Sequence, residues 1–176
     1  MSIRRATIAP GMQFVIPLRP RGYALLVVVK YSASSRMLVG YCFGPARIAA
    51  PSALVIVDPG DEILIAQVTD TWIIDARWWL LGTLPEFDAS LWPASKFART
   101  DGLGRWFIEI YDECDPNAHL SSSAATAQEA ALLPFDTLYD PVTLQSRLSA
   151  ELDARELLWE EWIARRGSEL RGDQAF

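Results

Sequence analysis

The first half of the chain consists of short apolar runs separated by residues that favour turns. The runs are rich in Val, Ile, Leu and aromatic residues and lack the 3.6-residue spacing of a helix, so they predict β-strands. The predicted strands are residues 12–18, 23–32, 37–43, 53–57 and 63–68, with two shorter runs at 71–74 and 78–81. Many short strands at close spacing predict an antiparallel meander that curls or closes into a barrel-like sheet.

Glycine and proline mark where these strands end or bend. Asp58-Pro59-Gly60-Asp61 predicts a turn between two strands, and Gly44-Pro45 predicts the end of the strand before it. Gly40 lies inside a predicted strand, which indicates a bulge or a close approach of another chain segment. Residues 83–104 read as a loop, and residues 105–112 alternate between apolar and polar positions, so they predict the last strand.

The remaining third of the chain has the pattern of helices. Thr126 and Glu129 have the spacing of a capping box, which predicts a short helix. Asp140 is the expected N-cap of a final helix that Pro141 opens and Gly167 closes. Its apolar stripe, which we expect to pack on the sheet, consists of Leu144, Leu148, Leu152, Leu158, Trp159, Trp162 and Ile163.

These elements predict one α+β domain over residues 1–176. We expect a mostly antiparallel β core at 8–112, a helical region at 121–167 packed on it, and a frayed tail at 168–176. With 51% hydrophobic residues, the chain is too apolar for a disordered protein. Its most apolar run, 23–29, is far shorter than the roughly 20 residues that a membrane-spanning helix needs. Two cysteines cannot build a disulfide framework, so we expect a cytoplasmic protein. We do not expect the chain itself to bind a membrane.

Charge is distributed unevenly along the chain. Residues 1–100 carry 10 basic and 7 acidic side chains, a net +3, whereas residues 101–176 carry 6 basic and 15 acidic ones, a net −9. An acidic half can attract a basic partner, although a solvated helical surface gives the same count. With only two lysines and scattered arginines, the sequence predicts no nucleic-acid binding.

The segment from Asp112 to His119 is the main candidate for chemistry. His119 is the only histidine, so any nucleophilic pair would have to use it with Cys114 and an acid such as Asp112. Asp112, Glu113, Asp115 and His119 could also ligate a cation, but their spacing matches no established metal loop. No phosphate-binding glycine motif is present. We interpret His119 as a surface-loop histidine and predict no catalytic residue, metal or cofactor.

The chain contains seven tryptophans, so one of them can contact a partner while others pack in the core. We expect Trp79, Trp159 and Trp162 to serve the core, and Trp92, in a proline-containing loop, to be the aromatic residue that faces a partner. The predicted partner-binding residues are Trp92, Glu109, Asp112, Glu113, Asp115, Glu156, Glu160 and Glu161.

Two short motifs add a family resemblance. Residues 10–18 (PGMQFVIPL) lead through Gly22-Tyr23-Ala24 into a valine-rich strand, and Trp79-Leu80-Leu81-Gly82 follows with Pro85. A loop containing Phe87, Pro93 and Phe97 comes next. Over residues 8–112 this pattern resembles the immunity protein 26 family. It departs from the family at Met12-Gln13, where an acidic residue is expected after the glycine.

The resemblance implies a mostly β protein that is encoded beside a polymorphic toxin and neutralises that toxin by binding it. The family contributes no catalytic residues, and the matching Phe14, Pro17, Trp79 and Gly82 would serve the fold. The expected partner is a cognate toxin, for which a basic nuclease domain is one candidate. Two alternatives stay open: a general protein- or peptide-binding module, and a small hydrolase or metal-dependent enzyme that uses the Asp112–His119 segment.

Overall fold

The computed structural model describes residues 8–18, 22–47 and 50–154. It is an α+β structure built mostly of strands, arranged in two sheets. The larger sheet has the order β5-β1-β2-β3-β4-β9. Its strands are β1 (Met12–Pro17), β2 (Tyr23–Ser32), β3 (Met37–Arg47), β4 (Leu64–Thr69), β5 (Trp79–Thr83) and β9 (Leu138–Tyr139). The first four form the predicted antiparallel meander, and β9 joins β4 in parallel.

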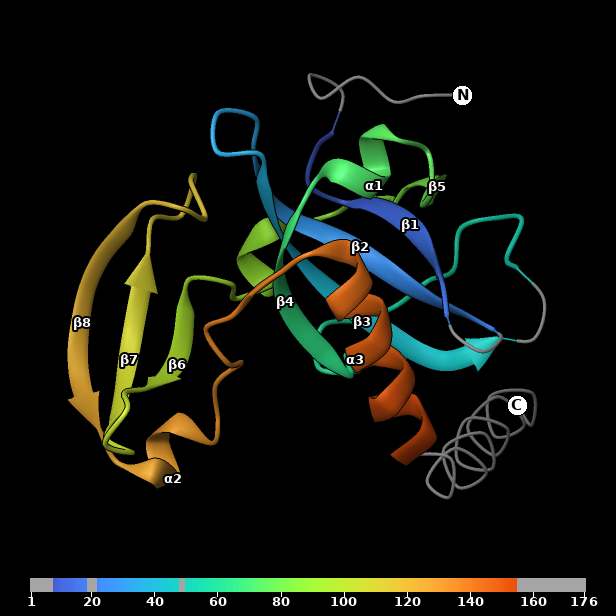
Figure 1. Ribbon diagram of the computed structural model, residues 1–176. Helices are drawn as coiled ribbons and strands as arrows, with labels where there is room; N and C mark the ends of the chain where they lie inside the picture. Colours follow the sequence, from blue (N-terminus) through green and yellow to red (C-terminus); the bar gives the residue numbers. More distant parts are fainter. Residues whose placement is uncertain (1–7, 19–21, 48–49, 155–176) are drawn as a thin grey trace, which may run out of the picture.

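The smaller sheet is a second meander that stands beside the first (Figure 1). It has the order β6-β7-β8, and its strands are β6 (Lys96–Thr100), β7 (Trp106–Tyr111) and β8 (His119–Ala125). The helical elements are α1 (Thr71–Ile74), η2 (Ala89–Leu91), α2 (Ala127–Ala130) and α3 (Pro141–Ala154). No helix in the described ranges is long and apolar enough to cross a membrane.

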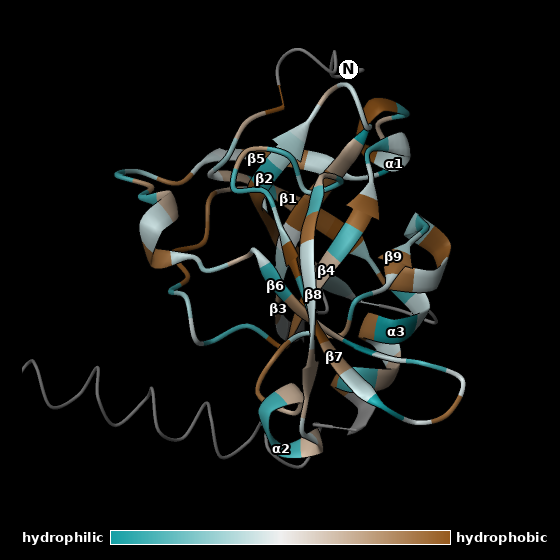
Figure 2. Ribbon diagram, turned by 90° about the vertical axis from the view of Figure 1, so that its left-hand side faces the viewer, coloured by the Kyte–Doolittle hydropathy of each residue, from teal (hydrophilic) through white to brown (hydrophobic). Residues whose placement is uncertain are grey.

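Both faces of the larger sheet are buried, which explains why β2 reads as a continuous apolar run. One face packs with α1 and α3; its core includes Phe14, Leu26, Leu38, Ile73, Trp78, Leu144 and Leu148. The other packs with β6 and the chain that precedes it; this core includes Val15, Val27, Tyr41, Phe43, Trp92 and Phe97. Figure 2 shows the apolar residues concentrated in these central strands.

A bulge in β2 decides which side Lys30 faces. Val28 pairs with Gly40 and Lys30 pairs with Val39, so Val29 is an extra residue. Beyond an extra residue the alternation of faces reverses. Lys30 therefore lies on the side of the smaller sheet. Gly40 is also the site of a close approach, because a Cβ there would lie 2.7 Å from Leu26 Cδ1. The expectation from its glycine is confirmed.

Helix α3 begins as predicted. The Asp140 carboxylate accepts hydrogen bonds from the backbone N–H groups of Val142 and Thr143. Leu144 and Leu148 are fully buried against the sheet, and the Gln145 side-chain amide donates to the Pro17 carbonyl of β1. The predicted stretch to Gly167, with Trp159 and Trp162, lies outside the described residues, as does the predicted tail 168–176. The capping box that opens α2 is confirmed: Thr126 accepts from the Glu129 N–H, and the Glu129 carboxylate accepts from the Thr126 N–H.

Several predicted boundaries are wrong. The larger sheet does not close into a barrel, because β5 and β9 lie at its opposite edges. The predicted helical region 121–167 contains most of β8 and all of β9, so 105–112 is not the last strand. The predicted loop 83–104 contains β6, the run 71–74 forms α1, and β3 continues through Gly44-Pro45.

Residues 53–57 do not form the predicted strand. The backbone of this segment is hydrogen-bonded to a side chain of β1 and not to a neighbouring strand. The Gln13 side-chain amide donates to the Val55 carbonyl and accepts from the Val55 N–H, both at 2.9 Å. A carboxylate at position 13 could only accept and would lose the hydrogen bond to the Val55 carbonyl, so both contacts require an amide side chain there.

Candidate functional site

A polar cluster lies on one face of the smaller sheet, around the buried carboxylate of Glu109. Arg99 Nε donates to Oε1 at 2.7 Å, Ser122 Oγ donates to Oε1 at 3.0 Å, and His119 Nε2 lies 2.7 Å from Oε2. Strand pairing explains the arrangement. Ser122 is directly opposite Glu109 and Arg99 is opposite Phe107, so β6 contributes Arg99 and β7 contributes Glu109 on the face to which β8 contributes Ser122 and His119.

The environment keeps Glu109 ionised. Burial acts to raise the pKa of its carboxyl group, but the hydrogen bonds from Arg99, His119 and Ser122 outweigh burial and leave the pKa below its ordinary value. The same contact with Glu109 raises the pKa of the Arg99 guanidinium. The cluster therefore contains a fixed negative charge that is paired with Arg99 and hydrogen-bonded to His119 and Ser122.

His119 is not the surface-loop histidine that the sequence predicted. It opens β8, contacts Glu109, and packs edge-on against Tyr111 with ring centroids 5.5 Å apart. A nucleophilic relay needs the hydroxyl group to donate to the histidine, which the acid orients from behind. Here Ser122 donates to Glu109 instead. The cluster thus ties three strands together and does not have the order of groups that activates a serine.

In the loop between β7 and β8, two of the predicted partner-binding acids accept hydrogen bonds from the loop's own backbone. Asp112 Oδ1 accepts from the backbone N–H groups of Cys114 at 2.7 Å and Asp115 at 3.0 Å. These hydrogen bonds lower the pKa of Asp112. Asp115 Oδ1 accepts from the Asn117 N–H and from Ser35 Oγ at the β2–β3 turn. The described residues contain no group of three His, Cys, Asp or Glu side chains that could hold a metal ion.

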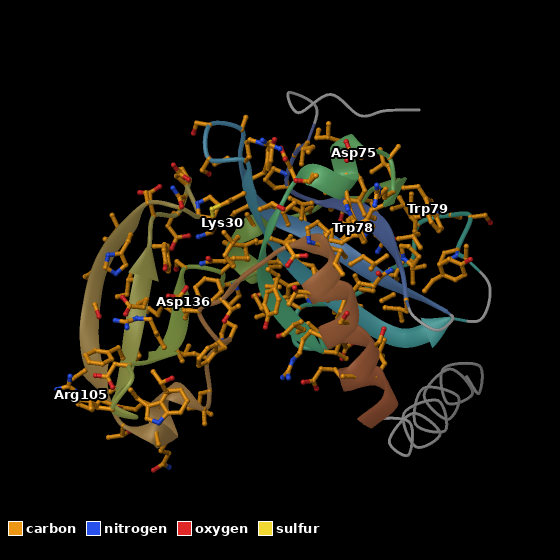
Figure 3. The ribbon with its side chains drawn as sticks, in the orientation of Figure 1. Lys30, Asp75, Trp78, Trp79, Arg105 and Asp136 are labelled. Atoms are coloured by element: carbon orange, nitrogen blue, oxygen red, sulfur yellow. The ribbon has the colours of Figure 1, made fainter. Side chains whose placement is uncertain are left out.

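Glu113 connects this loop to the larger sheet. Its Oε2 lies 2.8 Å from Nζ of Lys30, whose side chain is only 8% exposed. The two groups border a half-open pocket of about 370 Å³ between β2 and the loop. The pocket is lined by Pro10, Val29, Lys30, Tyr31, Ala89, Ser90, Glu113 and Cys114. Figure 3 shows Lys30 and Asp136 where the two sheets adjoin, on the opposite side from Trp78 and Trp79.

Trp92 does not face a partner, contrary to the prediction from its loop. Its ring is buried between the sheets, with centroids 5.2 Å from Tyr41, 6.0 Å from Phe43 and 5.5 Å from Phe87. The turn η2 brings the loop back over β3, so the ring covers the sheet. The remaining predicted contacts, Glu156, Glu160 and Glu161, lie outside the described residues.

Sequence reasoning missed an exposed apolar segment that runs from the end of α2 to the start of α3, which we call the 129–142 strip (Figure 1). Its exposed large apolar side chains are Leu132, Phe135, Leu138 and Val142. It also contains Glu129, Asp136 and Asp140 and no basic residue. The available clue was apolar residues spaced three or four apart where no continuous helix could form, because Pro134 interrupts the pattern.

Comparison with protein-family models, curated proteins and solved structures found no match to any of them.

Proposed function

We propose that this protein is a non-catalytic binding protein that holds and neutralises a cognate toxin, and that it does so through the 129–142 strip. The observation that carries the proposal is the concentration of exposed apolar side chains. Of the nine large hydrophobic residues exposed in the described chain, four fall within this segment. Such a concentration of exposed apolar side chains in one segment favours a protein-interaction site.

The charge of the strip indicates a basic partner. Its net charge is −3, since Glu129, Asp136 and Asp140 have no basic residue among them. Glu129 and Asp140 cap helices, and their hydrogen bonds to Thr126 and Thr143 lower the pKa of both carboxyl groups. They therefore stay charged at neutral pH. An acidic rim around apolar contacts would accelerate association with a basic toxin domain.

The arrangement of the resembling motifs is a second support. The two motif pieces lie on adjacent strands: Val15 of β1 pairs with Trp79 of β5, and Gln13 pairs with Gly82. Segments about 65 residues apart in sequence therefore form one structural unit, as expected if both motifs serve the fold. We infer from this that the immunity protein 26 resemblance describes a scaffold, and that the binding surface is elsewhere on it.

The test is binding to the product of the adjacent gene, measured by calorimetry with a catalytically inactive toxin. We expect submicromolar affinity for the full chain. Leu132→Lys should weaken binding at least tenfold, because Leu132 is 84% exposed within the strip. Leu103→Lys is the matched control, since Leu103 is 80% exposed in the β6–β7 turn. Absence of binding at micromolar concentrations contradicts the function, and equal effects of the two variants contradict the assigned surface.

A general protein-binding module is the second candidate, and the same strip favours it. The two functions differ in the partner. A module that binds the toxin without reducing the toxin's activity would support the general function and contradict neutralisation.

A further inference from the structure

The two edges of the smaller sheet differ in how their backbone groups are satisfied. At the β6 edge, Ala98 N–H donates to the Pro134 carbonyl at 2.8 Å, and Asp136 N–H donates to the Ala98 carbonyl at 2.7 Å. The chain therefore covers this edge with its own 134–136 segment. At the β8 edge, no strand of the described chain pairs with β8 on the side away from β7. Figure 1 shows β8 as the outermost strand.

The free backbone groups on β8 can be assigned from the register. Tyr111 N–H donates to the Ser95 carbonyl, so the peptide groups of Tyr111 face β6 and those of Ile110 and Ile108 face β8. Ile110 pairs with Ser121 and Ile108 with Ser123. Alternation then leaves the N–H and C=O groups of Ser122 and Ala124 directed outward.

Few of the features that usually block strand addition are present in β8; one is the bulge at Leu120, near the start of the strand, where the register with β7 shifts. The sequence HLSSSAA contains no Lys, Arg, Asp, Glu or Pro, and all residues but Ala125 are exposed. Native edge strands commonly carry such residues to prevent pairing with another chain. Residues Ser121 to Ala125 are small and uncharged, so the same segment of a second copy fits against them in antiparallel register without a contact between like charges.

We propose that two copies of this chain pair through their β8 strands, antiparallel about Ser122, to form one continuous six-stranded sheet. In this register Ser122 lies opposite its own copy and Ser121 opposite Ser123. The bulge at Leu120 ends the regular pairing at each end, beside Ala124 of the copy. No pair joins like charges. Leu120, which is 62% exposed, gains an apolar neighbour on each side of the two-fold axis. The interface is isologous, as closed two-fold symmetry requires.

The dimer is tested on the full chain, without a toxin, by sedimentation equilibrium over a range of concentrations. We expect a species of twice the 19.6 kDa chain mass. Leu120→Lys and Ala124→Pro should each raise the dimer dissociation constant at least tenfold, the first by placing charges beside the axis and the second by removing an outward N–H. Ile56→Lys is the control and should leave it unchanged, because Ile56 is 63% exposed and lies outside both sheets.

A cross-link provides a second measurement that does not depend on disruption. An antiparallel hydrogen-bonded pair has Cα atoms about 5.5 Å apart, a separation that suits a disulfide. In a Cys114→Ser background, Ser122→Cys should therefore form a covalent dimer under mild oxidation. Ser123→Cys should not, because Ser123 faces Ser121 of the copy and not its own equivalent.

Three outcomes would overturn the proposal. The first is a wild-type chain that stays monomeric at all concentrations. The second is a dimer that Leu120→Lys and Ala124→Pro leave intact, with circular dichroism showing that both variants are folded. The third is a monomer whose binding to the toxin is lost in these variants, which would assign the β8 edge to the toxin. Because dimerisation is measured without toxin, it stands or falls separately from the proposed function.

Discussion

Lys30 of β2 and Glu113 of the β7–β8 loop form an ion pair that connects the two sheets, with 2.8 Å between Nζ and Oε2. The pair is asymmetric, because Lys30 is almost buried whereas the Glu113 side chain is 75% exposed. The bulge at Val29 creates it, since without the extra residue Lys30 would face the apolar core under α3. A local irregularity in one strand thus determines how the second sheet is held.

Because Lys30 is buried and Glu113 is exposed, we expect the two substitutions to lower the free energy of unfolding by different amounts. Glu113→Ala should cost about 1 kcal/mol of unfolding free energy, because it leaves an ammonium group of low exposure without its carboxylate. Lys30→Met should cost less, since it replaces the charge with an apolar chain of similar length. Urea denaturation of both single variants and of the double variant measures the coupling. Additive costs in the double variant would show that Lys30 does not depend on Glu113.

Because Trp92 is buried, we expect its substitution to reduce stability, whereas the sequence suggested that it would reduce binding to a partner. Trp92→Ala should destabilise the fold by about 3–5 kcal/mol, as expected for a buried aromatic residue that contacts Tyr41 and Phe43. Leu91→Ala is the adjacent control, and because Leu91 is exposed it should change stability by less than about 0.5 kcal/mol. Thermal melts of both variants provide the comparison. A stable Trp92→Ala variant with impaired binding would restore the original interpretation.

The strands that the sequence predicted are those whose own composition favours β structure. β2 is apolar on both faces because both faces are buried, and it is recognisable from its residues alone. β6 (KFART) and β8 (HLSSSAA) each hold a single large aliphatic or aromatic residue. Neither has an apolar pattern of its own, so their strand conformation depends on pairing with β7, which no local pattern reveals.

The same limit applies to the polar cluster. The alternation in residues 105–112 correctly predicted a strand that contains Glu109 and Tyr111. The contact with His119 required knowing that the chain after Asp112 returns as β8, and the acids of that loop read as solvated rather than as hydrogen-bonded to its backbone. α1 is the opposite case: Thr71–Ile74 has the composition of a strand but forms a helical turn, where Ile73 and Ile74 N–H groups donate to the Asp70 carbonyl.

Position 40 has no room for a side chain, whereas the glycine at position 102 has open space around it. A Cβ at Gly40 would lie 2.7 Å from Leu26 Cδ1 and 2.9 Å from its Cγ, so Gly40→Ala should cost about 1–3 kcal/mol through overpacking. A Cβ at Gly102 would meet nothing within 4 Å, so Gly102→Ala should be nearly neutral. Adding Leu26→Ala to Gly40→Ala relieves the clash, and the double variant should be more stable than the sum of the two single effects predicts. Additive effects in chemical denaturation would exclude this contact as the cause.

The Glu109 cluster predicts how stability falls in acid. The pKa of Glu109 is lowered in the folded protein, so the unfolded chain binds its proton first as the pH falls. The stabilisation is therefore complete above the ordinary glutamate pKa and is lost as the pH drops through the folded value. Glu109→Gln should cost about 1–3 kcal/mol at pH 7, because Arg99, His119 and Ser122 lose a charged acceptor, and the difference from wild type should shrink as the pH falls below about 4. Asp58→Asn, in the exposed turn before β4, should instead follow the wild-type pH profile. Urea melts from pH 7 to pH 3 measure both, and a Glu109→Gln deficit that persists undiminished at pH 3 would show that packing, and not charge, is what the carboxylate contributes.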